Sequence, residues 1–235
     1  MSLVIDGLSA VASERTAVHD ASLSLSRGEI ACVLGPNGAG KSELVLAIAG
    51  KLAKVAGSIT LEGRDITTAG SAAIRAAGVA VVPEGHRVLT DLHVDDNLRA
   101  AASGLSVDPE ERLAAVYGTF PELAERKKQR AGSLSGGQQQ MLALGHALMA
   151  KPDYLLIDEM SLGLAPLIVK RLAGVVAELR ADGVGILLIE QFTDMALSLS
   201  DQAFVMVQGR IVFSGDPKDL AADPDKLHRL YMGQT

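Results

Sequence analysis

The chain has 235 residues, of which 48% are hydrophobic and 21% are charged, and its formal net charge is -6. This length allows one large domain or two small ones with a sizeable core, and because no Lys/Arg block exceeds the one at 125–130, nucleic acid is excluded as a primary partner. Cys32 is the only cysteine, the N-terminus has no signal-peptide pattern, and no apolar run approaches the roughly 20 residues of a membrane span, so we expect a soluble cytoplasmic protein.

Short apolar runs alternate with helical patterns in the first part of the chain, which is typical of an α/β protein with buried parallel strands. Residues 29–34 predict a strand that enters a glycine-rich loop, and residues 43–52 predict the helix after that loop. An antiparallel strand and turn are expected at 57–66, followed by a strand at 78–85 that ends at Pro83.

The strand pattern disappears between about residues 90 and 150. Asp108 is a suitable N-cap there, with Pro109 at the first helical position, and residues 136–151 show helical spacing. We predict one domain, residues 1–235, with a helical insertion at about 85–150. The elements expected after the insertion are a strand at 153–159, a helix at 165–183, a strand at 183–191 and a hairpin at 203–215 that turns at Gln208 and Gly209.

The segment GPNGAGKS has the spacing of a phosphate-binding loop and lies between the first predicted strand and helix. Its glycines allow backbone N–H groups to face phosphate oxygens, while Lys41 would neutralise the β- and γ-phosphates and Ser42 would ligate Mg²⁺. A chance match in a chain of this length is on the order of one in a hundred. The predicted nucleotide-binding residues in this loop are Gly35, Pro36, Asn37, Gly38, Ala39, Gly40, Lys41, Ser42 and Glu43.

Two acidic residues, Asp158 and Glu159, end the strand predicted at 153–159. Phosphoryl transfer needs a carboxylate near Mg²⁺ and a group that orients or deprotonates the attacking water. Asp158 suits the first role and Glu159 suits the second. By itself an acidic strand end is equally consistent with an ordinary cap, but beside a phosphate loop it indicates a catalytic pair.

A second anion-binding element, LSGGQQQ at residues 134–140, comes between these two motifs. A hydroxyl, two glycines and a helix N-terminus are suited to an anion, and the alternative is a helix-start loop without a ligand. Two phosphate-binding helix ends in one chain are redundant unless they serve different sites.

Taken in order, GPNGAGKS, VPEG, LSGGQQQM, LLIDE and SLGLAP resemble the motifs of the ATP-binding subunit of ABC transporters, and the resemblance covers essentially the whole chain. It implies a P-loop NTPase of the α/β class, with a mostly parallel core sheet, an N-terminal antiparallel β subdomain and a helical insertion subdomain. It also implies two ATPase domains packed head to tail, with each ATP between Lys41 of one chain and a loop of its partner. That loop would contribute Ser135, Gly136, Gly137 and Gln138.

The finer resemblance is to the ATPase subunits of branched-chain amino acid importers, which share VPEG at 82–85, SLGLAP at 161–166 and an EQ pair at 190–191. This resemblance implies that Glu84 lies near Mg²⁺ and the transmembrane partner, and that Gln191 lies near the γ-phosphate. The implied catalytic residues are Lys41, Glu159 and Gln191, and the implied metal ligands are Ser42, Asp158 and Glu84.

The same resemblance implies ATP and Mg²⁺ as cofactors, and hydrolysis coupled to the uptake of a small nutrient, most simply a branched-chain amino acid. The expected partners are permease subunits, a second ATPase subunit in a homo- or heterodimer and, indirectly, a substrate-binding protein. The chain would then lie in the cytoplasm, on the inner face of the cell membrane. The alternative is a non-hydrolytic nucleotide-binding partner in a heterodimeric pair. Sites that no longer hydrolyse ATP usually lack the equivalent of Glu159 or of the metal-binding Ser42, but both residues are present here.

A few residues depart from the family pattern. Val11 and Ala12 stand where an adenine-stacking aromatic is usual, Met160 stands in place of proline, and His146 stands in place of arginine. Base stacking contributes roughly 1–3 kcal/mol on single strands, so we expect an ATP affinity about tenfold or more below that of relatives. None of these changes removes a catalytic atom.

Glu43 places a carboxylate in a loop that binds anions. Pointed at the α-phosphate from about 4 Å, it would cost ~1 kcal/mol in water and ~4 kcal/mol at an effective dielectric constant of about 20. Turned outward, it would lose one hydroxyl–phosphate hydrogen bond of roughly 1.5–3 kcal/mol and gain ~0.3–1 kcal/mol from the helix dipole. We therefore expect Glu43 to turn outward when ATP is bound, and to weaken nucleotide binding without abolishing it.

Overall fold

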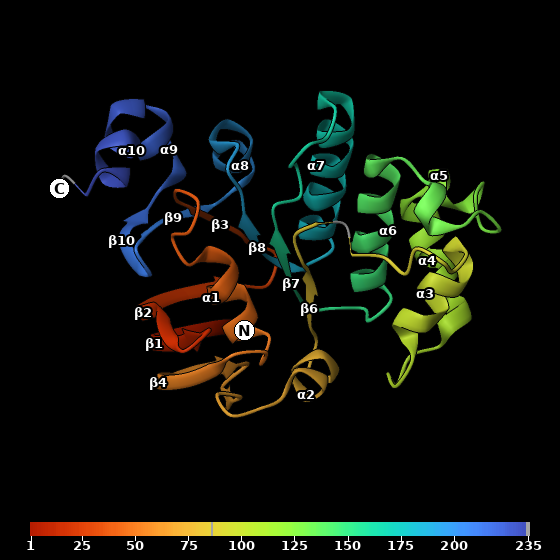
Figure 1. Ribbon diagram of the computed structural model, residues 1–235, viewed down its shortest axis with the longest axis horizontal. Coiled ribbons are helices and arrows are strands. Elements are labelled where there is room, and N and C mark those ends of the chain that lie inside the picture. Colours follow the sequence, from red (N-terminus) through yellow and green to blue (C-terminus); the bar gives the residue numbers. More distant parts are fainter. Residues whose placement is uncertain (86, 234–235) are drawn as a thin grey trace.

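The computed structural model describes residues 1–85 and 87–233, and its core is a six-stranded sheet (Figure 1). All neighbouring strands of this sheet are parallel, except that the strand nearest the C-terminus is antiparallel to its neighbour. The predicted mostly parallel core sheet is therefore confirmed. In sheet order the strands are β10 (Arg210–Gly215), β9 (Gln202–Val207), β3 (Ile30–Leu34), β8 (Gly185–Ile189), β7 (Tyr154–Asp158) and β6 (Val79–Val82).

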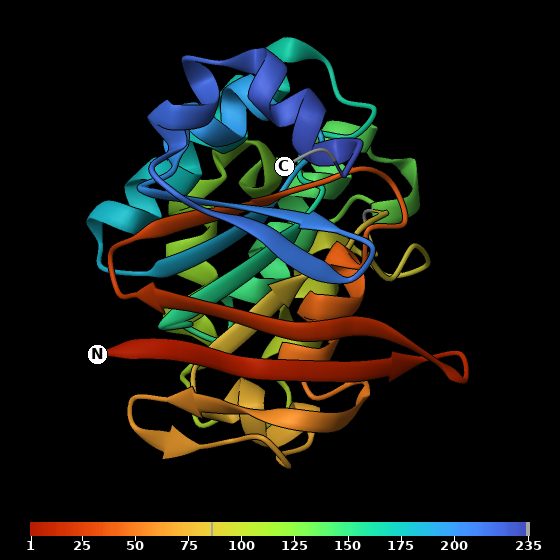
Figure 2. The ribbon, with the colours of Figure 1, turned by 90° about the vertical axis from the view of Figure 1, so that its left-hand side faces the viewer.

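A second sheet is antiparallel and contains, in order, β2 (Arg15–Ser26), β1 (Ser2–Ala12), β4 (Ala53–Leu61) and β5 (Arg64–Asp65). Figure 2 shows β1 and β2 crossing the lower half of the view, below the core strands. With α1 (Lys41–Ile48), this sheet packs against the core sheet in one cluster of buried apolar side chains. The predicted N-terminal antiparallel β subdomain is confirmed.

The other face of the core sheet is covered by helices. Alternate residues of β3 belong to two separate apolar clusters, with Ala31 facing α1 and Cys32 facing the helices, because successive side chains of a strand point to opposite faces. The longest helix has 16 residues, and no helix in the described part of the chain has the length and apolar character of a membrane span. The helices on this face include α6 (Gly136–Leu148), α7 (Pro166–Ala181), α8 (Thr193–Leu199), α9 (Pro217–Ala221) and α10 (Pro224–Tyr231).

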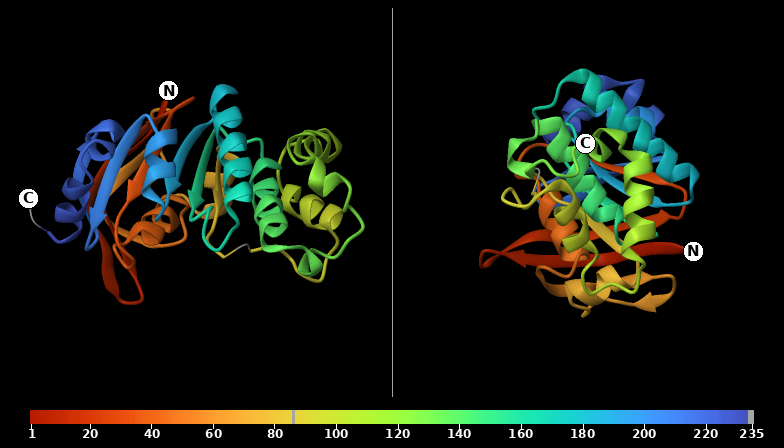
Figure 3. Two further views of the ribbon diagram at one scale, coloured as in Figure 1. Left: turned by 90° about the horizontal axis from the view of Figure 1, so that it is seen from above. Right: turned by 90° about the vertical axis from the view of Figure 1, so that its right-hand side faces the viewer.

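Helices replace strands between β6 and β7, as the sequence predicts. Figure 3 shows these helices at one end of the molecule, with α9 and α10 at the opposite end. Asp108 accepts a hydrogen bond from Glu110 N at 2.9 Å, so it caps the helix that begins at Pro109. The elements between β6 and α6 are α3 (Val94–Ala102), α4 (Pro109–Thr119), α5 (Pro121–Ala124) and the 3₁₀ helix η1 (Ala131–Ser133), whereas α2 (Ser71–Ala76) precedes β6.

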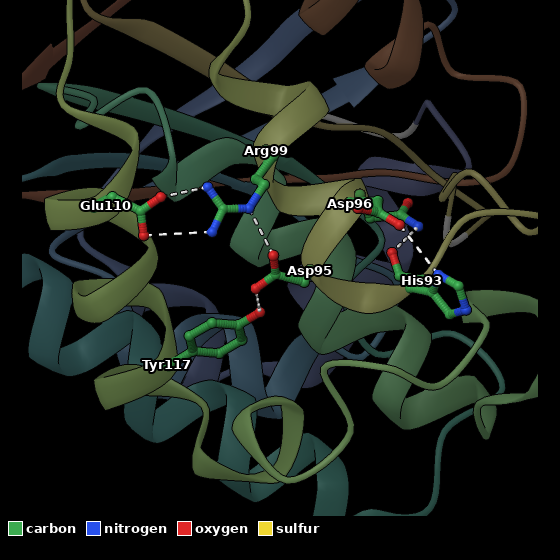
Figure 4. Close-up of polar contacts among 7 residues, drawn as sticks. His93, Asp95, Asp96, Arg99, Glu110 and Tyr117 are labelled. Atoms are coloured by element: carbon green, nitrogen blue, oxygen red, sulfur yellow. Dashed lines mark hydrogen bonds and ion pairs between the residues drawn. The ribbon is translucent and has the colours of Figure 1, made fainter.

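Polar side chains join α3 to α4 (Figure 4). Arg99 Nε donates to Asp95 Oδ2 at 2.6 Å, and its Nη1 donates to Glu110 Oε1 at 2.5 Å. Tyr117 donates its hydroxyl proton to Asp95 Oδ1 at 2.8 Å. Because the side chains of Arg99 and Glu110 are 43% and 71% exposed, we expect this network to orient the two helices more than to stabilise the fold.

Helix α1 differs from the predicted helix at 43–52 at both ends. It begins at Lys41, directly after the glycine-rich loop, and it ends at Ile48. Gly50 stops it, with φ +70 and no room for a side chain, since a Cβ there would lie 2.7 Å from the carbonyl oxygen of Ala69. The chain then turns directly into β4.

His146 lies on α6 beside a cavity of about 410 Å³ that Lys51 and Arg75 also line. Its Nε2 atom is buried and has no hydrogen-bond partner among the described residues. Burial, and to a smaller extent the charge of Arg75, lowers the pKa of His146 to about 4. The folded protein therefore favours the neutral imidazole.

We expect His146→Gln to reduce the acid sensitivity of folding. Because the pKa of His146 is about 4 when folded and about 6.5 when unfolded, unfolding takes up a proton between these values. Wild-type stability should therefore fall by up to about 2–3 kcal/mol from this residue as the pH drops through that window. Urea unfolding at about pH 7.5 and about pH 4.5 measures the effect, and an equal decrease in wild type and variant would contradict it.

Candidate active site

The glycine-rich loop joins β3 to α1 and is seated where side chains do not fit. A Cβ on Gly35 would lie 2.2 Å from the carbonyl oxygen of Met206, and a Cβ on Gly40 would lie 2.6 Å from that of Ala17. Gly40 also has φ +100, a conformation that glycine adopts at little cost. Its carbonyl accepts a helical hydrogen bond from Leu44 N at 2.9 Å, so the loop leads directly into the helix N-terminus.

Lys41 lies inside the curve of this loop and is 5% exposed. Its Nζ donates to the carbonyl oxygens of Gly35 at 2.8 Å and Pro36 at 3.1 Å. Burial lowers the pKa of Lys41, and nearby carboxylates, Glu159 first, oppose that shift. A cation beside a helix N-terminus gives the loop the positive potential that phosphate oxygens need.

Asp158 ends β7 and is 4% exposed. Burial raises its pKa to about 6; a hydrogen bond from the Ser42 hydroxyl opposes the rise, and the charges of Glu159 and Glu84 add to it. Its Oδ1 atom is buried and has no hydrogen-bond partner among the described residues. The unpartnered oxygen of Asp158 therefore belongs to a carboxylate that is bonded to the Ser42 hydroxyl and close enough to Glu159 and Glu84 to be affected by their charges.

These groups fit Mg²⁺, which takes oxygen ligands and is usually held by one or two carboxylates together with phosphates and water. The part of the chain that the structure describes has no group of three His, Cys, Asp or Glu side chains that could hold a metal ion on its own. A site made of Ser42, Asp158 and Glu84 would thus depend on phosphate oxygens to complete the shell.

Glu159 follows Asp158 and has φ +54, which is uncommon for a residue other than glycine. Its N–H donates to Ile189 O at 2.9 Å, which continues the pairing between β7 and β8. Gln191, just beyond β8, donates from Nε2 to Glu159 Oε1 at 2.6 Å. The end of β8 therefore sets both the backbone and the carboxylate of Glu159.

Most of the predicted loop residues, with three carboxylates, line one cavity of about 440 Å³. Glu43, in the first turn of α1, faces this cavity with Glu84 and Glu159. Among the described residues that line it there is no aromatic side chain, and neither Val11 nor Ala12 is one of them. The lining residues are Asn37, Gly38, Ala39, Gly40, Lys41, Ser42, Glu43, Glu84, Glu159, Leu162 and Gln191.

The predicted residues 135–138 do not line this cavity. Ser135 caps α6: its hydroxyl oxygen accepts from Gln138 N at 3.4 Å, and Gln138 Oε1 accepts from Ser135 N at 3.1 Å. Gly137 packs against α7, since a Cβ there would lie 2.8 Å from Ile168. Ser135 and Gly136 are exposed, so a second molecule could reach them.

The sequence did not predict two residues near the site. Leu162 lines the cavity, and Glu190, which is 1% exposed, accepts hydrogen bonds from Ser161. Both belong to motifs that carry the family resemblance, SLGLAP and EQ. An acidic residue directly after an apolar strand was the available signal for Glu190.

The fold and the cavity define an α/β nucleotide-binding protein with a phosphate loop. The chain matches the family model described as ABC transporter over residues 18–161, more than half of its length, and it belongs to that family. It is 42% identical over 234 residues to the high-affinity branched-chain amino acid transport ATP-binding protein BraG of Pseudomonas aeruginosa, covering 98% of this chain and 99% of that protein. It is 36% identical over 220 residues to the probable branched-chain amino acid transport ATP-binding protein LivF of Archaeoglobus fulgidus, covering 92% of each.

Solved structures agree with this assignment. A nucleotide-free ATP-binding cassette from an ABC transporter superposes with a TM-score of 0.87 at 28% identity, covering 98% of this chain and 99% of that chain. The ADP conformation of an ATP-binding cassette gives a TM-score of 0.85 at 28% identity, covering 99% of each. The P-loop NTPase fold is confirmed, and the chain is an ATP-binding subunit of an ABC transporter that couples ATP hydrolysis to transport.

We expect Glu43→Thr to increase MgATP affinity by about tenfold or more, because it removes a negative charge from the cavity wall and supplies a hydroxyl to a phosphate. Glu43→Gln removes the charge without supplying the hydroxyl and should give an intermediate affinity. Calorimetric titration with MgATP measures both. Affinities equal to wild type in both variants would show that the carboxylate has no role at the phosphates.

Proposed function

We propose that this subunit energises an importer that takes up a small nutrient, most simply a branched-chain amino acid. The observation that supports this best is the match to BraG and LivF, which are named for branched-chain amino acid transport, at 42% and 36% identity over nearly the full chain. The VPEG and EQ motifs favour the same group.

In the proposed mechanism, Lys41 and the backbone N–H groups of the loop bind the phosphates, with support from the N-terminus of α1. The Glu159 carboxylate orients the attacking water and accepts its proton, while Lys41 neutralises charge on the phosphates. Gln191 has a second amide N–H beyond the one it donates to Glu159 at 2.6 Å, so it can contact a phosphate oxygen and the catalytic carboxylate together.

Ser42, Asp158 and Glu84 are the residues we propose to hold Mg²⁺. When bound, the ion would supply positive charge that neutralises the charge developing on the phosphates. Since the pKa of Asp158 is about 6, this carboxylate is ionised at neutral pH and able to bind a cation.

We propose that two ATPase subunits pack head to tail, so that Ser135, Gly136, Gly137 and Gln138 of one subunit contact the ATP held by Lys41 of the other. The exposure of Ser135 and Gly136, and their position outside the cavity of their own chain, support this arrangement. The second subunit is a copy of this chain or a distinct ATPase subunit.

We further propose that residues 1–235 form a single ATPase domain with a helical subdomain at about 85–150. Glu84, exposed at the start of that segment, would lie near the permease subunits. The permease subunits would hold the chain in the cytoplasm, at the inner face of the membrane. A substrate-binding protein would be an indirect partner of this chain.

We expect Glu159→Gln to lower phosphate release by at least about 100-fold, because the amide cannot accept the proton of the attacking water. The same variant should keep ATP bound and accumulate as an ATP-dependent dimer in size-exclusion chromatography. Glu178→Gln, an exposed substitution on α7, is the matched control and should retain wild-type turnover. Equal background rates in wild type and Glu159→Gln would contradict a hydrolytic role and favour the non-hydrolytic partner.

The same variant tests the transport proposal in cells that lack the gene. The wild-type chain should restore uptake of labelled leucine, and Glu159→Gln should not. Full leucine uptake in the deletion strain, with normal phosphate release by the purified wild type, would leave the ATPase assignment intact and contradict the substrate class.

A further inference from the structure

Glu190 and Gln191 follow β8 directly and hold the segment 159–161 at both of its ends. Gln191 donates to Glu159 at 2.6 Å. The Glu190 carboxylate accepts from Ser161 twice, from the backbone N–H at 3.1 Å and from the hydroxyl at 2.5 Å. Between these two contacts Met160 is buried, at 1% exposure.

The contact between Glu190 and Ser161 lies in the interior, where each residue is 1% exposed. Burial raises the pKa of Glu190 to about 6, and the hydrogen bonds from Ser161 oppose that rise. A buried carboxylate is costly unless it is hydrogen-bonded. Without Glu190, the buried backbone N–H and hydroxyl of Ser161 would both lose their hydrogen-bond acceptor.

Glu159 needs such support because its backbone, with φ +54, is in a conformation that non-glycine residues rarely adopt. Conformations of this kind persist where the surrounding structure determines them. On one side the determinant is the hydrogen bond from Glu159 N to Ile189 O, and on the other it is Ser161, fixed by Glu190. The carbonyl oxygen of Ser161 also accepts from Leu164 N at 3.2 Å. The contact between Glu190 and Ser161 therefore also fixes the loop that places Leu162 at the cavity.

We propose that Glu190 is a positioning residue for ATP hydrolysis. By accepting both hydrogen bonds of Ser161, it holds the chain segment that carries Glu159 so that the Glu159 carboxylate stays in the nucleotide cavity. Glu190 does not line that cavity, so it would act through Ser161 rather than by contact with the nucleotide. The inference rests on the proposed catalytic role of Glu159.

Phosphate release and MgATP binding by the purified full-length chain test this inference. The variants are Glu190→Ala, Ser161→Ala, their double combination, and Glu190→Gln, which keeps an oxygen for the Ser161 N–H and offers an amide N–H to its hydroxyl oxygen. Ser198→Ala is the matched control, since its hydroxyl donates to Met195 O at 2.8 Å on α8, outside the site. Glu159→Gln in the same assay tests the proposed function itself.

We expect Glu190→Ala and Ser161→Ala each to lower kcat by at least about tenfold, with KM and MgATP affinity changed by less than about threefold. Glu190→Gln should restore most of kcat, and Ser198→Ala should match wild type. Both residues act through one contact. The kcat of the double variant should therefore be no lower than that of the less active single variant.

Wild-type kcat in Glu190→Ala or Ser161→Ala, or losses that multiply in the double variant, would overturn the inference if Glu159→Gln is inactive. A Glu159→Gln variant with wild-type turnover would instead overturn the proposed function. If circular dichroism shows that Glu190→Ala does not fold, Ser161→Ala decides: a kcat about tenfold lower supports the positioning role, and a wild-type kcat overturns it.

Discussion

Parallel pairing of β3, β8 and β7 is the constraint on which the site depends. Val33 lies opposite Ile189, and Ile189 lies opposite Asp158, so the three strands end at nearly the same level. The phosphate loop after β3, the carboxylates after β7 and the Glu190–Gln191 pair after β8 therefore leave the sheet at one edge. Ligands bind at this carboxyl edge in open α/β sheets, and the register explains how residues far apart in sequence meet there.

The charges at this edge favour a cation together with a phosphate. Lys41 is surrounded by the charges of Glu159, Asp158, Glu43 and Glu84, which oppose the effect of burial on its pKa. Burial keeps the pKa of Asp158 at about 6, and its Oδ1 is without a partner among the described residues. A nucleotide that arrives with Mg²⁺ would supply positive charge to these carboxylates and negative charge to Lys41, which is the chemistry expected of an ATPase of this family.

Local sequence signals predicted what depends on local structure. Continuous apolar runs located β3, β7 and β8 because both faces of these strands are buried, and the glycine spacing located the phosphate loop because those positions exclude side chains. The predicted end of α1, residue 52, was wrong because Gly50 stops the helix. The close contact of Gly50 with Ala69 joins residues 19 positions apart, so the helical pattern of residues 43–52 does not indicate it. Register shifts along β1 interrupt its alternation of apolar and polar residues, and no range was predicted for that strand.

Contacts across strand ends could not be predicted in this way. The bonds from Gln191 to Glu159 and from Ser161 to Glu190 depend on the register between β7 and β8, and no spacing within one segment encodes that register. The family resemblance, rather than any local pattern, indicated that Gln191 belongs to the site. It also implied that Ser135 serves a different nucleotide from the one its own Lys41 holds, which fits the position of Ser135 outside the cavity.

The Mg²⁺ dependence of ATP binding by Asp158→Asn tests this account most directly. Calorimetric titration of the wild-type chain should show ATP affinity falling at least about tenfold when Mg²⁺ is replaced by EDTA, because the carboxylates then face an uncompensated triphosphate. In Asp158→Asn this loss of affinity should be at least about threefold smaller than in the wild type, since one of the three residues proposed to hold the ion is lost while the carboxylates that line the cavity remain. An Asp158→Asn chain that keeps the wild-type Mg²⁺ dependence would contradict the account.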